Sequence, residues 1–146
     1  AMQQSSAIQI AIFVAAAAFT ACGKKLEVEP LEDVAPAPLR AVMLDIDQLN
    51  WKIEPVVRLP EQFQAVGSWA SSIQKLASDP AWATYVESDS FLGDRPLFES
   101  HRANLLAGST ILMNGAVEGD VDDMREGFVL MQQSCIACHK RYQPNI

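Results

Sequence analysis

Two cysteines and a histidine stand close together near the C-terminus, as Cys135, Cys138 and His139 in the run Cys-Ile-Ala-Cys-His. On a helix, residues three and four positions apart share one face, so the two thiols and the imidazole would point the same way. Two thiols at this spacing can add to the two vinyl groups on one edge of a haem, and the imidazole then reaches the iron. The motif therefore predicts one covalent haem c, held by Cys135 and Cys138, with His139 as the proximal iron ligand.

Other chemistry fits the same residues less well. A zinc site needs a fourth ligand, and His101 is the only other histidine, which we expect to have a packing or surface role. A thioredoxin-like dithiol stands at the start of a helix after a strand, whereas this motif ends a helical pattern. No Ser-His-Asp order, phosphate-binding loop or pair of carboxylates stands out in the sequence. We therefore expect no enzymatic turnover beyond what a haem supports alone.

The first residues predict export from the cytoplasm. Residues 7–21 are almost wholly apolar and uncharged, and this run is shorter than a membrane-spanning helix requires. The run ends Phe19-Thr20-Ala21-Cys22, which resembles the lipobox of bacterial lipoproteins and implies cleavage before Cys22 and a lipid on its sulfur. The alternative is an uncleaved N-terminal membrane anchor. Both interpretations place the rest of the chain on the periplasmic side of a bacterial membrane.

Composition and charge indicate which partners are excluded and where the domains begin and end. The net charge of −7 argues against nucleic acid, because a protein that binds nucleic acid needs a basic face. Residues 1–21 would be the export signal or anchor. Residues 22–38 contain three prolines and several charges without helical periodicity, so we expect the lipid-attachment cysteine followed by a flexible linker. Residues 39–146 would then form one folded haem domain.

Apolar residues recur at the spacing of one helical face in four stretches. The predicted helices cover residues 39–53, 60–77, 96–116 and 121–142. Asp94 and Asp120 are suited to cap the last two helices. Pro55 ends the first, and Asp79-Pro80 ends the second. No stretch alternates as a strand does, so the prediction is an all-α fold, an antiparallel four-helix bundle with the haem on its C-terminal helix.

The position of the haem motif, in the last dozen residues of a four-helix chain, resembles the cytochrome c′ family, the class II cytochromes c. The likeness covers about residues 39–146 and is strongest after Glu118. The matching segments are Phe98-Glu99, Leu105, Ala107, Gly119-Asp120 and the run from Cys135 to Tyr142. The resemblance implies a left-handed antiparallel bundle with the haem near one end. It also implies that Tyr142, at the position of a family aromatic residue, packs under the motif.

In that family, the residue that faces the iron opposite the histidine comes from the first helix. It is a ligating methionine in low-spin members and an apolar residue in high-spin members. Met43 stands at the matching position, and Arg40 stands where an arginine of the family pairs with a haem propionate. The resemblance thus leaves two roles for Met43: a distal iron ligand that raises the potential, or a side chain that fills the core.

Three functions follow from these alternatives. A six-coordinate iron between His139 and Met43 would make the protein a membrane-tethered electron carrier for redox partners that are themselves membrane-associated. A five-coordinate iron in an apolar pocket would make it a cytochrome c′ that binds NO or CO. The third option is a haem-bearing subunit of a larger membrane electron-transfer complex. Members of the family often form homodimers, so a homodimer is one expected oligomeric state.

Overall fold

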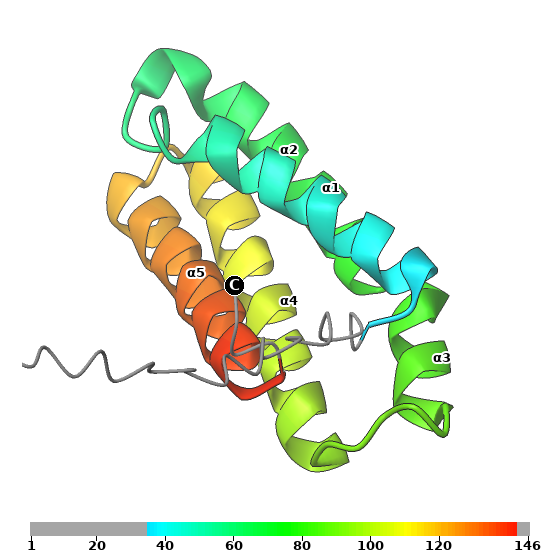
Figure 1. The fold of residues 1–146 in the computed structure, drawn as a ribbon. Helices are drawn as coiled ribbons and strands as arrows, with labels where there is room; N and C mark the ends of the chain where they lie inside the picture. Colours follow the sequence, from blue (N-terminus) through cyan, green and yellow to red (C-terminus); the bar gives the residue numbers. More distant parts are fainter. Residues whose placement is uncertain (1–34, 143–146) are drawn as a thin grey trace, which may run out of the picture. The chain divides into compact units, whose positions relative to one another are not determined.

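The computed structural model describes residues 35–142. Within that range every regular element is a helix, and no strand occurs (Figure 1). The elements are α1 (Ala37–Ile53), the 3-10 turn η1 (Pro60–Gln62), α2 (Phe63–Ala77), α3 (Pro80–Glu87), α4 (Arg95–Glu118) and α5 (Val121–Tyr142). The prediction of an all-helical fold with four long helices is confirmed. The predicted export segment 1–21, the lipidation residue Cys22 and most of the predicted linker lie outside the described residues.

Capping residues begin α4 and α5 where the sequence predicted. The Asp94 carboxylate accepts a hydrogen bond from the backbone amide of Leu97 at 3.1 Å. The Asp120 carboxylate accepts two, from amides in the first turn of α5, at 2.9 and 3.0 Å. These bonds satisfy amides that have no partner within the helix. Gly119 ends α4 with a φ of +75°, a conformation that glycine adopts without strain, so the chain turns sharply and α5 runs back along α4.

Elsewhere the helices depart slightly from the predicted boundaries. α1 begins at Ala37, two residues early, because Pro38 fits the first turn of a helix, where no amide donor is required. The second helix opens as a 3-10 turn at Pro60 before it becomes α2. Asp79 not only follows α2 but also caps α3, because its carboxylate accepts a hydrogen bond from the amide of Ala81 at 2.8 Å.

The helices α4 and α5 approach each other closely through glycine. Gly108 and Gly115 on α4 and Gly127 on α5 are all buried. A Cβ atom on Gly108 would lie 2.7 Å from the carbonyl oxygen of Gly127, and one on Gly115 would lie 2.8 Å from the amide nitrogen of Met124. Larger residues at these positions would force the two backbones apart. α4 ends at Glu118, two residues beyond the predicted end.

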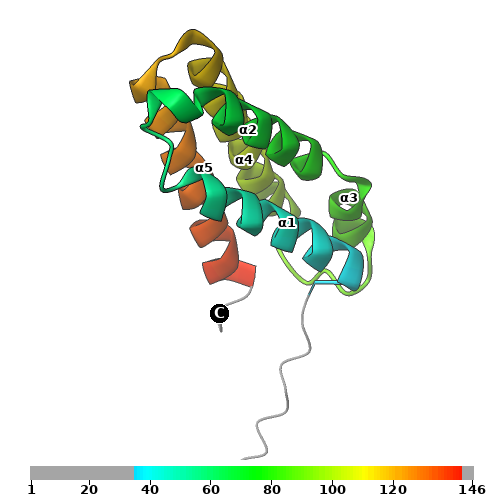
Figure 2. The same cartoon turned by 90° about the horizontal axis from the view of Figure 1, so that it is seen from above.

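Successive long helices run in opposite directions (Figure 1). α2 packs against both α1 and α4, α4 packs against α5, and α1 also meets the short helix α3 (Figure 2). The largest fully buried side chains between them are Leu39, Ile53, Val66, Ile73, Phe98, Leu112, Met124 and Met131. Among the described helices, none combines the length and the apolar character needed to cross a bilayer. α1 and α5 together border the cavity that contains the candidate site.

Candidate haem-binding site

The predicted haem motif lies in the last turns of α5. Cys138 is buried, Cys135 and His139 are half-buried, and all three side chains line one cavity. The buried Ser134 donates a hydrogen bond from its hydroxyl to the backbone carbonyl oxygen of His101 on α4. This bond fixes the turn of α5 that carries the motif against its neighbouring helix. The helix therefore presents both thiols and the imidazole to the same space.

The cavity has a volume of about 430 Å³, which lies within the usual range of roughly 300–1,000 Å³ for cofactor and ligand sites. Helices α1, α3, α4 and α5 all contribute to its wall. The lining residues are Arg40, Met43, Leu44, Ile46, Asp47 and Asn50 on α1, Trp82 on α3, His101, Arg102 and Leu105 on α4, and Ser134, Cys135, Cys138 and His139 on α5. Seven of the fourteen are polar or charged and come from α1, α4 and α5, although most of the surface that faces the cavity is apolar.

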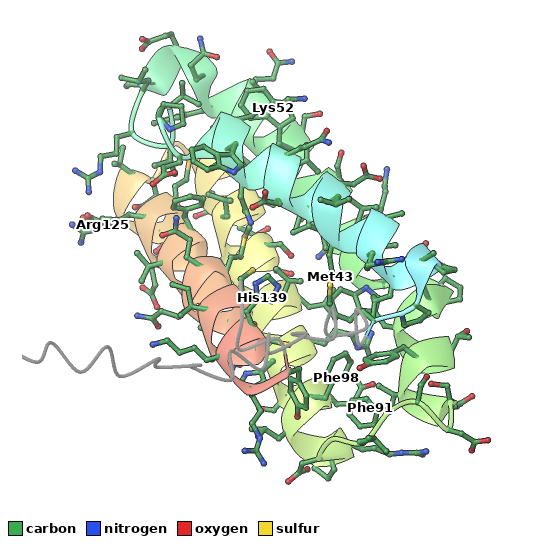
Figure 3. All side chains as sticks on the ribbon, in the orientation of Figure 1. Met43, Lys52, Phe91, Phe98, Arg125 and His139 are labelled. Atoms are coloured by element: carbon green, nitrogen blue, oxygen red, sulfur yellow. The ribbon has the colours of Figure 1, made fainter. Side chains whose placement is uncertain are left out.

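Met43 and Arg40, the two site residues predicted on the first helix, line this same cavity. In Figure 3, the side chains of Met43 and His139 come from α1 and α5 and both project into the space between these helices. A second, much smaller hollow is also bordered by both residues. The structure therefore brings the predicted distal and proximal residues to one site. Ligation of an iron by Met43 stays a prediction.

The donor set of the cavity fits a haem. The buried Oδ1 atom of Asn50 has no hydrogen-bond partner among the described residues, and buried acceptors nearly always have one. Asn50 is also one of the residues that line the cavity. Arg40 adds a guanidinium group of the kind that matches carboxylates such as haem propionates, whereas the guanidinium group of Arg102 bonds the Glu99 carboxylate at 2.7 Å. Two thiols and an imidazole are the groups that attachment of a covalent haem requires, and the cavity offers them beside a thioether and a mostly apolar wall.

The surroundings of the two thiols disfavour a reactive dithiol. Burial raises the pKa of Cys138 to about 11, and the neighbouring Cys135 adds to this effect. Burial also raises the pKa of Cys135, with a further contribution from the Asp47 carboxylate, and a backbone hydrogen bond acts in the opposite direction. Redox-active and nucleophilic cysteines have lowered pKa values because the thiolate is the reactive form. The thioredoxin-like alternative is therefore disfavoured by the environment of the thiols as well as by their place at the end of a helix.

An aromatic cluster lies beside the motif, where α3, α4 and the end of α5 meet. The Tyr142 ring packs edge-on against Phe98, with ring centroids 5.4 Å apart, and its hydroxyl donates a hydrogen bond to the carbonyl oxygen of Asp94 at 2.9 Å. Tyr85 and Phe91 extend the cluster with a T-shaped contact at 5.2 Å. Figure 3 shows Phe91 and Phe98 on the side of the site toward the start of α4. The cluster fixes the last turn of α5, and the packing role expected for Tyr142 agrees with it.

Sequence reasoning missed several residues of the wall. Asp47 and Asn50 follow Met43 by four and seven residues, so they share its face of α1, and the helical spacing alone could have identified them. His101, expected to have a packing or surface role, lines the cavity from α4, and its ring lies 6.5 Å from that of Tyr142. The same spacing marked His101, because it stands four residues before Leu105, which also lines the cavity.

Comparison of the chain with protein-family models, with curated proteins and with solved structures found no match. The function proposed below therefore depends on the motif, on the cavity that it borders and on the family resemblance of the sequence. Cys22, the predicted lipidation site, lies outside the described residues and takes no part in this geometry.

Proposed function

We propose that this chain is a mono-haem c-type cytochrome that carries electrons. The observation that supports this most strongly is the convergence of Cys135, Cys138 and His139 on one cavity of about 430 Å³ whose opposite wall bears Met43. A covalent haem needs two thiols and a histidine on one helix face, next to a space of suitable size. The accompanying fold would be a four-helix bundle of the cytochrome c′ type.

In this proposal the thiols of Cys135 and Cys138 would each hold the haem by adding across one of its vinyl groups, with a new sulfur–carbon bond and transfer of the thiol proton to the other vinyl carbon. His139 would hold the iron from the α5 side, and Arg40 would pair with a propionate. The bound haem supplies a one-electron iron couple. The buried, apolar wall would exclude water around that couple.

Met43 decides how the site would work. If its thioether binds the iron opposite His139, the iron is six-coordinate and its potential is raised, which suits an electron carrier. Leu44 and Ile46 line the same wall beside Met43. If one of these apolar side chains faces the iron instead, the distal position is open, and the protein would be a cytochrome c′ that binds NO or CO. We favour the carrier, because Met43 projects into the same space as His139 (Figure 3).

The proposed setting is the periplasmic side of a bacterial membrane. A lipid on Cys22, or an uncleaved N-terminal anchor, would tether the haem domain through the proline-containing linker. Its partners would then be redox proteins at the same membrane, with a fixed place in a larger membrane complex as the alternative. Purification in mild detergent distinguishes these two, because a free carrier would separate from its partners and a subunit would remain with them.

Absorption spectra of the ferric and ferrous protein, before and after addition of CO, test the carrier against the gas-binding alternative. A sulfur-to-iron charge-transfer band in the ferric spectrum, sharp ferrous bands and no response to CO are expected for ligation by Met43. The variant Met43→Ala should lose that band and bind CO. Broad ferrous bands in the native protein that sharpen with CO would contradict ligation and favour the gas-binding function.

A further inference from the structure

Besides its two histidines, the wall of the cavity holds three side chains that carry a charge, Arg40, Asp47 and Arg102. The guanidinium group of Arg102 bonds the Glu99 carboxylate at 2.7 Å, so the charge of Arg102 is largely offset. Arg40 would pair with a haem propionate in the proposed function. Within the part of the chain that the structure describes, the Asp47 carboxylate has neither an ion pair nor a hydrogen bond. The charge that stays uncompensated at this wall is therefore negative.

The position of Asp47 places this charge beside the haem motif. Asp47 follows Met43 by four residues on α1, and residues at this spacing lie on one face of a helix. Burial raises the pKa of the Cys135 thiol on α5, and the Asp47 carboxylate raises it further, because a nearby negative charge disfavours the thiolate. The packing of the helices thus brings the carboxylate and Cys135 to the same cavity, although they are far apart in the sequence.

A negative charge beside the haem edge would act on the iron couple. Reduction adds one electron to the haem, so a nearby negative charge disfavours the reduced form and lowers the reduction potential. The thioether of Cys135 would lie at the edge of the ring, and a carboxylate close to that sulfur is then close to the ring as well. The Asp47 side chain is exposed, so water weakens its field at the iron and the effect is modest.

We propose that Asp47 is a potential-setting residue, whose carboxylate stabilises the ferric haem and lowers the reduction potential of the carrier. A Met43 thioether bound to the iron raises that potential, so the two residues of α1 act in opposite directions. The reduced carrier can then pass its electron to acceptors of lower potential than ligation by Met43 alone allows. This inference rests on the proposed function, because it assumes that the cavity holds the haem. It holds for a five-coordinate iron too, since the charge acts in the same way.

Potentiometric titration of the haem-loaded full chain, followed by absorption spectroscopy, tests this proposal. Asp47→Asn removes the charge and keeps nearly the same shape. At a fixed applied potential, its ratio of reduced to oxidised haem should be about threefold that of the native protein, which is about 30 mV at about 59 mV per tenfold change. Added salt should shrink this difference, because salt screens exposed charges. Asp47→Glu keeps the charge and should restore the native potential.

The matched control is Asp45→Asn. Asp45 is an exposed carboxylate two residues earlier on α1, and it is not among the residues that line the cavity. Residues two positions apart do not share one side of a helix. The potential of Asp45→Asn should therefore stay close to that of the native protein. A native potential in Asp47→Asn, or an equal rise in both variants, would overturn the proposal.

A second measurement reads the same charge without a haem. In the haem-free full chain with Cys138→Ser, the Cys135 thiolate would be alkylated either by iodoacetate, an anion, or by neutral iodoacetamide. A sulfur–carbon bond forms and iodide leaves in both reactions, so the ratio of their rates does not depend on the fraction of thiolate. Mass spectrometry of the peptide that contains residue 135 separates this reaction from that of Cys22.

The Asp47 carboxylate repels only the anionic reagent, so the ratio of the iodoacetate rate to the iodoacetamide rate should rise about twofold in Asp47→Asn. It should stay unchanged in Asp45→Asn. A ratio that does not respond to Asp47→Asn would contradict this placement of the charge, whether or not a haem is attached. If haem attaches and its potential does not respond to Asp47→Asn, the inference fails and the proposed function stands. If the native chain attaches no haem, the proposed function fails, and the role of Asp47 in setting a potential fails with it.

Discussion

Replacing Gly127 by alanine should destabilise the protein, because no room exists between α4 and α5 at that position. A Cβ atom there would lie 2.6 Å from the carbonyl oxygen of Gly108 and 2.9 Å from the Cα atom of Leu112. Carbon atoms that are not bonded rest about 3.5–4.0 Å apart. Both neighbours are backbone atoms of α4, so no side-chain rotation relieves the contact. The two helices would have to separate, and α5 would carry the haem motif with it.

The magnitude follows from two opposing terms. Overpacking of a core costs about 1–3 kcal/mol, and rigid backbone neighbours place this position at the upper end of that range. Alanine is favoured over glycine inside a helix by about 1 kcal/mol. The expected net loss in the free energy of unfolding is therefore about 2 kcal/mol, or roughly 8 °C in melting temperature for a domain of this size.

Urea unfolding followed by circular dichroism measures this loss. Gly67→Ala on α2 is a suitable control, because its new Cβ would lie 3.3 Å from the Cβ of Ala116, the tip of a small side chain. That variant should keep the stability of the native protein or gain slightly from helix propensity. If Gly127→Ala proves as stable as Gly67→Ala, the reasoning about close packing between α4 and α5 is wrong.

Two further stability predictions concern groups near the ends of α5. In the protein without haem, the pKa of Cys138 is raised from 9.0 to about 11, so the folded state keeps the thiol proton to higher pH than the unfolded chain. The raised pKa contributes about 3 kcal/mol to the free energy of unfolding below pH 9, and this contribution is lost as the pH rises to 11. Urea unfolding measured below pH 9 and above pH 11 should show the loss, and the variant Cys138→Ser should not show it. Asp120→Ala removes two capping hydrogen bonds at the start of α5 and should lower the free energy of unfolding by about 1 kcal/mol; unchanged stability would mean that water replaces the cap without cost.

The helices could be predicted from the sequence because their signals are local. The apolar spacing, the caps Asp94 and Asp120, and the break at Asp79-Pro80 each act within a few residues of the chain. The convergence of the motif with Met43 on one cavity was predicted only through the family resemblance, since no local signal relates α1 to α5. Arg40 was likewise predicted through the resemblance, because it stands where an arginine of the family pairs with a haem propionate.

Other features depend on contacts between helices that no single segment reveals. In the sequence, Gly108 and Gly127 are simply residues of low helix propensity, yet in the structure they allow α4 and α5 to approach closely. The orphaned acceptor of Asn50 is visible only when neighbouring helices leave it buried without a donor. The exposure of Leu44, which also lines the cavity, likewise depends on what the other helices leave uncovered. These features can be recognised only in the packed structure, because each depends on which residues of a neighbouring helix lie next to it.

The proposal of a covalent haem is tested most directly by the mass of the denatured protein. The full chain would be produced in bacteria that attach c-type haem in the periplasm, unfolded, separated from free haem and weighed by mass spectrometry. We predict a mass equal to the processed polypeptide plus one haem, and loss of that increment in the double variant Cys135→Ser, Cys138→Ser. A native polypeptide that carries no haem under conditions in which a control c-type cytochrome is fully loaded would contradict the proposal.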